Sequence, residues 1–263
     1  GMERTMMDYK LLMNTAILAG ETMLKSGAET YRVEDTINRI LKTSNAQTVE
    51  TVVLMTGIFV TLDDSGIDPI TVNKRVHARG MNLNRIDRVN TVSRSYCAGE
   101  ITLDEAYEEL KQIHSKQYRR MSYNLATIFV CAGFAPLFQG GFPEIAGAAL
   151  AGIALALIMT VGKYLKINGF ILNVFSAFGI ALTAIFLQDL VPMVDMDIVI
   201  ISSIMPLVPG VAITYAIRDT LQGDYLSGAA RILEAFMTAT AIALGVGTGF
   251  ALTGILQPGG GLF

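Results

Sequence analysis

The first dense group of reactive side chains is the segment SGAETYRVED at residues 26–35. It carries two glutamates, an aspartate, an arginine, a threonine and a tyrosine, which are side chains from which acid–base sites are built. The same residue types also fit the junction between two helices. The segment is therefore either an active site or a helix start.

Helix capping accounts for most of this segment. Gly27 can end a preceding helix in the left-handed conformation, and Ser26 with Glu29 matches a capping box. Glu34 and Asp35 would then lie in a first helical turn, where the helix dipole favours anions. We therefore predict a structural corner rather than an active site. Its residues are Gly27, Glu29, Arg32 and Glu34.

Charge is distributed unevenly along the 263 residues. Residues 1–121 hold 16 Lys/Arg and 16 Asp/Glu, whereas residues 122–263 hold four and seven. The first part is typical of a solvated protein and the second of an apolar environment. The net charge of −3 supplies no basic surface for nucleic acid, which we exclude as a partner.

Five apolar stretches of the second part are each long enough to cross about 30 Å of hydrocarbon at about 1.5 Å per residue. They lack the periodic polar face that a helix of a soluble core would show. The sequence therefore predicts a multi-pass protein in contact with the lipid bilayer. The predicted spans are residues 122–140, 143–162, 168–190, 197–217 and 229–256.

The charges that flank these spans predict an orientation. Retained Lys and Arg mark the cytoplasmic side, so we expect the N-terminal domain in the cytoplasm and the C-terminus outside the cytoplasmic (plasma) membrane. The cations on the predicted cytoplasmic side of the membrane are Lys116, Arg119, Arg120, Lys163, Lys166, Arg218 and Arg231. The opposite face carries Glu144, Asp189, Asp195 and Asp197.

The soluble part is predicted to be an α+β domain at residues 1–121, followed by an all-α membrane domain of five helices at residues 122–263. Two amphipathic helices come first, and the first ends near Ser26 and Gly27. A small three-stranded antiparallel sheet follows, since three β-branched runs are separated by turn signals. These runs are residues 48–55, 58–64 and 69–76.

Two further helices complete the predicted domain. Asn82 or Asn84 can cap the first of them, and Thr102 with Glu105 forms a capping box for the second.

Catalytic motifs are missing from this domain. The sequence has no HExxH, GxSxG, P-loop or GxGxxG pattern, and its two histidines, His77 and His114, are far apart. Cys97 and Cys131 fall on opposite sides of the charge boundary, which predicts two free thiols. We therefore predict neither an enzyme nor a metal site or cofactor.

The fourth predicted span is interrupted by the segment MPLVPG. Its prolines remove backbone donors, and broken helices of this kind often line a substrate site at the middle of a membrane. Arg218 lies further along and is suited to a substrate carboxylate, although it equally fits an anchor at the end of the span. The predicted substrate-binding residues are Pro206, Pro209, Gly210, Thr214 and Arg218.

Ionisable groups in the membrane part are candidates for proton coupling. A charge at a helix centre costs about 2.5–3.5 kcal/mol on insertion scales, so its presence indicates function. Asp219 and Glu234 are the two candidates. An ion pair between Glu234 and Arg231, three residues earlier, is the structural alternative.

Three segments of the chain form a recognisable signature, SGAETYRVEDTI, TGIFVTL and MPLVPGVAITYAIRDTLQGDYLSGAARILEA. Together they resemble the threonine/serine exporter family, and the similarity extends over about residues 8–255. This chain is similar to the larger subunit of a split form, which works with a small integral-membrane partner. The family motif maps onto Pro206, Pro209, Gly210, Arg218, Asp219, Gly223, Asp224 and Glu234 in the membrane part, and onto the corner residues Gly27, Glu29, Arg32 and Glu34.

The resemblance implies a secondary exporter of threonine and serine, or of a small dicarboxylate such as succinate. Two other classes remain open, a non-transporting regulatory or assembly subunit and a membrane-tethered hydrolase. A homo-oligomer is a further alternative for the assembly. Because Tyr31 and Arg32 are not explained by capping, we expect them to dock the helix pair of the corner against the cytoplasmic ends of the spans.

Overall fold

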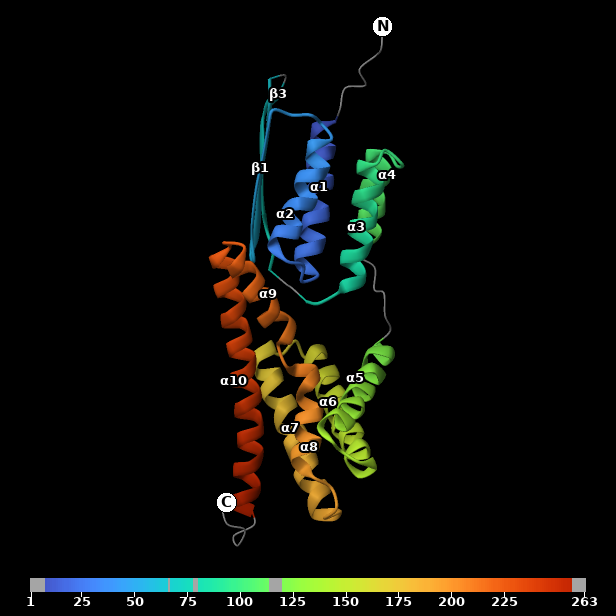
Figure 1. The fold of residues 1–263 in the computed structure, drawn as a ribbon, viewed down its shortest axis with the longest axis vertical. Coiled ribbons are helices and arrows are strands. Elements are labelled where there is room, and N and C mark those ends of the chain that lie inside the picture. The colour runs from blue at the N-terminus through green and yellow to red at the C-terminus, as the bar shows by residue number, and fades with distance from the viewer. Residues whose placement is uncertain (1–7, 66, 78–79, 114–119, 257–263) are drawn as a thin grey trace. The chain divides into compact units, whose positions relative to one another are not determined.

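The computed structural model describes residues 8–65, 67–77, 80–113 and 120–256 (Figure 1). The chain forms two compact units, one of Gly1–Lys116 with Tyr215–Ala230 and one of Gln117–Thr214 with Arg231–Phe263. The predicted order, an N-terminal domain followed by a membrane domain, is therefore only partly matched, because a late segment returns to the first unit. His114 and the flanking cations Lys116 and Arg119, which the sequence analysis named, lie outside the described residues.

The first unit begins with two helices, α1 (Tyr9–Lys25) and α2 (Thr30–Lys42). Asp8 caps α1 by accepting the amide of Leu11 at 2.9 Å. At the other end, Gly27 has a φ of +84°. The amides of Gly27 and Ala28 donate to the carbonyls of Leu24 and Met23, which completes a Schellman motif. The predicted role of Gly27 is thus confirmed.

The capping box predicted for Ser26 and Glu29 is wrong. Ser26 is the C-cap residue of α1. Glu29 is the N-cap residue of α2, but its side chain makes no capping hydrogen bond. The first turn of α2 contains no acidic residue, so Glu34 and Asp35 lie one turn later than predicted. Glu29 is only 2 % exposed and has a different partner, which is described below.

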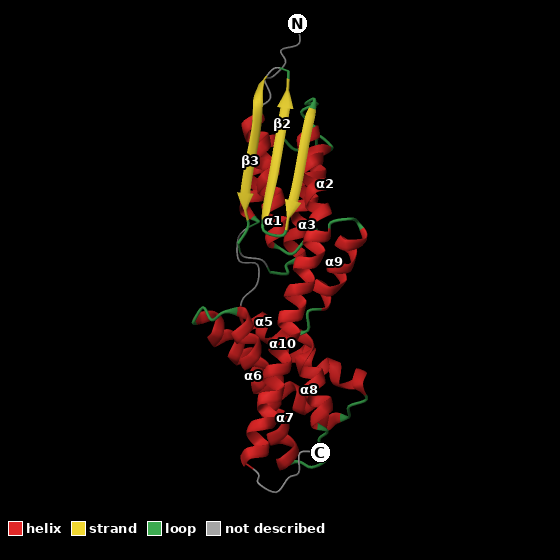
Figure 2. Ribbon diagram, turned by 90° about the vertical axis from the view of Figure 1, so that its left-hand side faces the viewer, coloured by secondary structure: helices red, strands yellow, loops and turns green. Residues whose placement is uncertain are grey.

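A three-stranded antiparallel sheet follows, in the order β1 (Thr48–Leu54), β2 (Gly57–Asp64), β3 (Ile67–Arg75). Thr51 pairs with Val60 in the first ladder, and Val60 with Val72 in the second. Figure 2 shows the strands side by side with helices behind them. The predicted strands and their order are confirmed.

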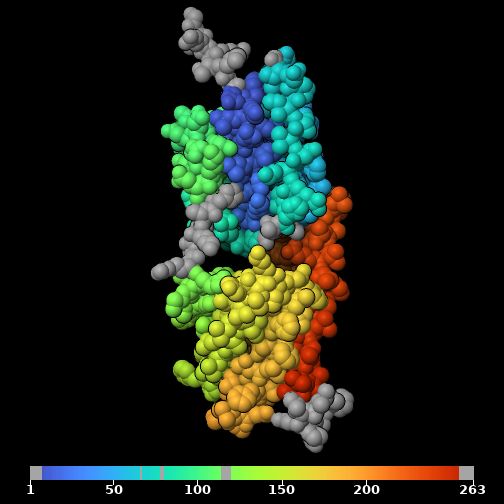
Figure 3. Space-filling model, turned by 180° about the vertical axis from the view of Figure 1, so that it is seen from behind, coloured from blue at the N-terminus to red at the C-terminus, as the bar shows by residue number. Residues whose placement is uncertain are grey.

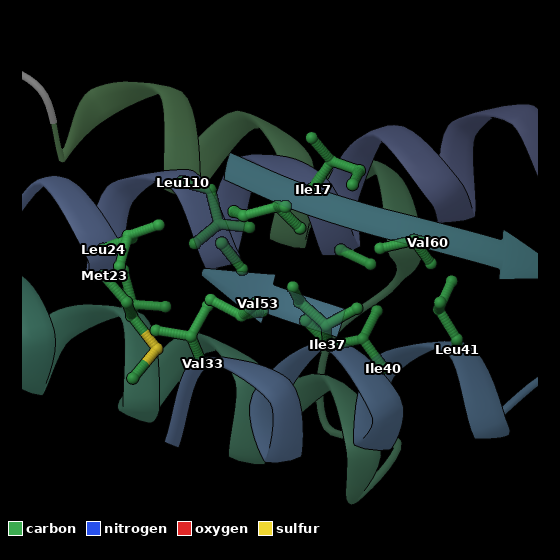
Figure 4. Packing of buried hydrophobic residues seen from close by; sticks show 14 of the residues in the cluster. Ile17, Met23, Leu24, Val33, Ile37, Ile40, Leu41, Val53, Val60 and Leu110 are labelled. Carbon is green, nitrogen blue, oxygen red and sulfur yellow. The ribbon is translucent and has the colours of Figure 1, made fainter. Parts of the chain in front are cut away.

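The core of the first unit lies between the two helices and the sheet. Val33, Ile37, Ile40 and Leu41 project from α2 at helical spacing and meet residues of α1, β1 and β2 (Figure 4). Each such side chain stabilises the fold by roughly 1.5–3 kcal/mol when fully buried. The core thereby fixes the position of α2, whose first residues carry the candidate site.

Two further helices complete the N-terminal part, α3 (Leu83–Cys97) and α4 (Leu103–Gln112). Asn82 caps α3 by accepting the amide of Arg85, and Thr102 with Glu105 forms a capping box on α4, so both predicted caps are confirmed. In Figure 3, α1 lies between α4 and the strands.

The remaining helices are long and apolar. Four of them are long enough to cross a membrane among the described residues, or five if the bent pair of α8 and α9 counts as one span. The prediction of five spans is matched in that form. The elements are α5 (Arg120–Phe134), η1 (Ala135–Phe138), α6 (Phe142–Tyr164), α7 (Gly169–Leu190), α8 (Met196–Ile204), η2 (Met205–Leu207), α9 (Gly210–Leu221) and α10 (Tyr225–Leu256).

Polar contacts fasten the second unit at a few points. Glu144 of α6 is buried, and its carboxylate accepts the amides of Gly141 at 2.7 Å and Asp195 at 3.1 Å. Asn124 and Thr160 join α5 to α6 through their side chains.

Cys97 and Cys131 are both free thiols, as predicted.

Candidate functional site

The candidate site lies in the first unit, where α2 meets the turn between α9 and α10. We call it the junction cluster. It consists of Glu29, Thr30, Tyr31, Arg218, Asp219 and Asp224. Five of these six side chains can ionise, and Glu29 and Asp219 are almost fully buried.

The turn between α9 and α10 is built by Gly223 and Asp224. Gly223 has a φ of +89°, and the amide of Asp224 donates to the carbonyl of Asp219 at 2.9 Å, so that a second Schellman motif ends α9. Asp224 then accepts the amide of Ser227 at 3.2 Å and caps α10. Two glycines of the family motif, Gly27 and Gly223, thus end the helices that lead into the cluster.

On either side of this turn, α9 and α10 approach each other closely at Gly228. A Cβ on Gly228 would lie 2.2 Å from the hydroxyl of Thr220 and 3.1 Å from the carbonyl of Ala216. Only glycine fits without displacing α9 from α10. The turn therefore presents Arg218, Asp219 and Asp224 as one fixed group.

The central contact is an ion pair between Arg218 and Glu29, 189 residues apart in the sequence. Arg218 donates from Nη1 to Oε1 of Glu29. The Glu29 side chain is 2 % exposed and that of Arg218 53 % exposed, so a buried carboxylate is neutralised from the solvent side. Burial and then the carboxylate of Glu29 raise the pKa of Tyr31, which places the phenol beside this pair.

A second contact joins the same two segments. The hydroxyl of Thr30 donates to Oδ2 of Asp224 at 2.8 Å and lies 3.4 Å from Oδ1 of Asp219. A hydroxyl has a single proton, so Asp224 is its main acceptor. Thr30 and Glu29 therefore fasten the start of α2 to the end of α9 and the start of α10.

Glu34 lies one turn further along α2. Its carboxylate accepts the amide of Val53 in β1 at 2.9 Å. Burial raises the pKa of Glu34, the Val53 amide opposes this rise, and the nearby charge of Asp224 adds to it. The pKa of Glu34 is thus affected by the charge of Asp224 in the junction cluster, although among the described residues Glu34 forms no ion pair with a cation of the cluster.

Glu34→Gln tests this balance. A raised pKa in the folded state means that folding takes up a proton, so the stabilising effect is complete below the unfolded pKa and is lost as the pH rises through the folded pKa. Glutamine keeps an acceptor for Val53 without the charge. We expect the variant to be more stable than the wild type at about pH 7 and no more stable at about pH 4.

Thermal unfolding of the full chain in detergent across this pH range measures the difference. Glu109→Gln, on the exposed side of α4, removes the same charge and serves as the control. Parallel pH profiles for the wild type and Glu34→Gln would contradict the assignment.

The predicted substrate residues Pro206, Pro209, Gly210 and Thr214 lie at the break between α8 and α9 in the second unit. The two helices are bent by 53° there. The backbone of Val208 is extended. In a regular helix the carbonyl of Met205 would accept the amide of residue 209, but that residue is a proline and has no amide hydrogen. The carbonyl of Met205 accepts the amide of Val208. The interruption predicted from MPLVPG is present.

The predicted residues thus fall into separate groups. Arg218 and Asp219 join Glu29 in the junction cluster, whereas the two prolines, Gly210 and Thr214 remain at the helix break. Arg218 follows Thr214 by four residues on α9, which is about one helical turn. Glu234 lies on an exposed position of α10 in the second unit, three residues after the buried Arg231.

Three residues of the cluster, Thr30, Tyr31 and Asp224, were not predicted as site residues, and Tyr31 was expected only to dock the helix pair. Thr30 carries no charge, and its hydroxyl has many local uses at a helix start. Asp224 stands in the family motif, but its helix-capping role gives no sign of a partner in α2. Arg32, which was predicted in the corner, lines a cleft between α2 and α3.

Long apolar helices, one of them bent at a proline break, together with a polar α+β unit define a multi-pass membrane protein. Over residues 14–253 the chain matches the family described as "Putative threonine/serine exporter". The protein belongs to this threonine/serine exporter family, so the predicted membership is confirmed. The family consists of transporters, and the expectation of a transporter rather than an enzyme is confirmed with it.

One curated relative carries a more specific name. The chain is 26% identical over 248 residues to the "Probable succinate transporter subunit YjjP" of Escherichia coli (strain K12), and the match covers 91% of this chain and 93% of the relative. No solved structure matches the chain.

Proposed function

We propose that this chain is the larger membrane subunit of a secondary exporter of small polar metabolites, coupled to protons. Its substrate is either threonine and serine or a small dicarboxylate such as succinate. A small integral-membrane partner subunit completes the transporter. The family membership and the subunit name of the relative support this proposal.

The break between α8 and α9 is the observation that carries the proposal. A helix interrupted within the membrane leaves backbone carbonyls and a helix N-terminus available to a polar solute. Gly210 begins α9 at that break, and a Cβ on it would meet no atom within 4 Å. The space beside Gly210 is therefore open, as a substrate site requires.

The proposed orientation follows the charges. The first unit lies in the cytoplasm and the C-terminus outside, in the cytoplasmic membrane, because Lys163 in the last turn of α6 and Lys166 just after it mark the side that retains cations. The junction cluster then lies at the cytoplasmic ends of α9 and α10.

Transport by purified subunits tests the proposed function. Vesicles containing this chain and its partner should take up labelled succinate or threonine when a pH gradient is applied, and vesicles with either subunit alone should not. Side-by-side measurement of succinate, threonine and serine identifies the substrate. Absence of uptake for all three solutes would contradict the proposal.

Glu234→Gln tests proton coupling. A gradient of about one pH unit supplies about 1.4 kcal/mol per proton, or a factor of about ten in the limiting concentration ratio. If Glu234 carries the proton, this response is lost in the variant. Glu109→Gln, which changes a glutamate on α4, should keep it. A Glu234→Gln variant with the full gradient response would remove Glu234 from the mechanism.

A regulatory subunit is the second candidate, and the junction cluster favours it. Glu29 and Thr30 hold the start of α2 against Arg218 and Asp224, so a soluble unit restrains the end of a broken span. Uptake by the partner subunit alone, at the rate of the complete transporter, would select this alternative.

A further inference from the structure

A polar cleft lies between α2 and α3 in the first unit, away from the junction cluster. Its volume is about 90 Å³. Three of the seven lining residues are arginines, and every one of the seven bears a polar or charged side chain. The lining residues are Arg32, Asp35, Thr36, Arg39, Asn90, Ser93 and Arg94.

Helical periodicity brings these residues together. On α2 they recur at positions i, i+3, i+4 and i+7, and on α3 at i, i+3 and i+4. Each set therefore forms one face of its helix, and the two faces meet at the cleft. Neither face is apolar, although α2 and α3 pack against each other and share a hydrophobic core. Packing alone does not account for this arrangement.

The charges in the cleft do not balance. Asp35 is the sole acidic residue among the described lining residues, and it already pairs with Nε of Arg39 at 2.8 Å. Arg32 and Arg94 remain, which leaves an excess of two positive charges. Guanidinium groups present several donors in a fixed fork that matches phosphate and carboxylate oxygens.

Two buried hydroxyl side chains lie between the arginines. Thr36 is 6 % exposed and Ser93 is 5 % exposed, and both line the cleft. Helical threonines such as Thr15 and Thr22 donate to the carbonyl four residues back. Thr36 makes no hydrogen bond of this kind in the described part of the chain, so its hydroxyl is available to a ligand.

We propose that this cleft binds a small dianion, such as inorganic phosphate or a short dicarboxylate. Arg32 from α2 and Arg94 from α3 bind its oxygens from two sides, and the hydroxyl of Thr36 donates from below. A small ion is favoured over an acidic protein or a lipid surface because the arginines line a cleft of only about 90 Å³, in which Thr36 and Ser93 are buried.

Calorimetric titration of the full chain in detergent tests the site. Sodium phosphate and sodium succinate are titrated separately at constant ionic strength set with sodium chloride. We expect saturable binding of at least one of these dianions. Arg32→Gln and Arg94→Gln should each weaken it by about tenfold or more, because each removes hydrogen bonds to a charged group, and Thr36→Val should weaken it by several-fold.

Arg88→Gln is the matched control, since it removes an arginine from an exposed position of α3 outside the cleft. It should leave the affinity unchanged. Equal affinities for the wild type and Arg94→Gln would overturn the proposal, as would the absence of saturable binding by either dianion. Binding of anionic-lipid vesicles alone, dependent on Arg94, would also overturn it. The titration requires no transport, so its outcome is independent of the proposed exporter role.

Discussion

Arg218→Gln is expected to weaken the attachment of residues 215–230 to α2, so that this segment opens roughly 30–150 times more often. Removing one partner of a buried ion pair typically costs about 3–5 kcal/mol, because a charge is left buried without compensation. Glu29 is in that position, at 2 % exposure. The estimate is reduced because the Arg218 side chain is 53 % exposed, so water replaces part of the interaction.

Amide hydrogen exchange of the full chain in detergent measures this effect locally. Amides of the α9–α10 turn and the first turn of α2 should exchange roughly 30–150 times faster in the variant, if they exchange through local opening. Amides of the β2–β3 ladder, in which no described residue forms a hydrogen bond or ion pair with the cluster, should be unaffected. Arg88→Gln provides a control with the same loss of charge on α3.

A double-mutant cycle separates the pair from its surroundings. Glu29→Gln removes the buried charge, so adding Arg218→Gln to it should cost much less than Arg218→Gln alone. The coupling is expected to be about 1–3 kcal/mol. Additive effects of the two substitutions would show that Glu29 and Arg218 do not interact, and would remove the central contact of the junction cluster.

Much of the secondary structure of the first unit could be predicted from short-range signals for helix caps, strands and turns. Gly27, Asn82 and Thr102 each act within a few residues of their own position, so the sequence around them contains the whole interaction. The strands were also predictable because β-branched runs alternate with turns. The break in the fourth span was predictable for the same reason, since a proline removes its own backbone donor.

The partner of Glu29 was not predictable in this way. A glutamate three residues after a serine fits a capping box, and local sequence offers no alternative. The actual partner, Arg218, lies 189 residues away, and the pairing follows from the return of residues 215–230 to the first unit. No periodicity or charge count in the sequence shows that return. A local interpretation therefore gave the wrong role to the most buried acid of the segment.

The helix break and the junction cluster are joined by one short helix. α9 begins at Gly210, next to the break, and ends at Leu221, just past Arg218 and Asp219. A change in the bend at Pro209 would therefore alter the direction in which α9 leaves the break. The proposed substrate site thus depends on the conformation of the break itself, and Pro209 is the residue to change.

Pro209→Ala is expected to reduce transport by at least about tenfold under the proposed exporter role. Alanine supplies the missing backbone donor, which can then bond to the carbonyl of Met205, and a helix interior prefers alanine to proline by about 3 kcal/mol. The substitution therefore favours a continuous helix over the 53° bend. A continuous helix would remove the interruption at which the proposed substrate site lies.

The initial rate of succinate or threonine uptake into vesicles with both subunits measures the effect, normalised to the amount of this chain in the membrane. Pro143→Ala is the matched control, because Pro143 lies in the first turn of α6, where no backbone donor is required. It should retain the wild-type rate. An undiminished rate for Pro209→Ala, at equal membrane content, would show that transport does not require the break, and the substrate site would then have to lie elsewhere.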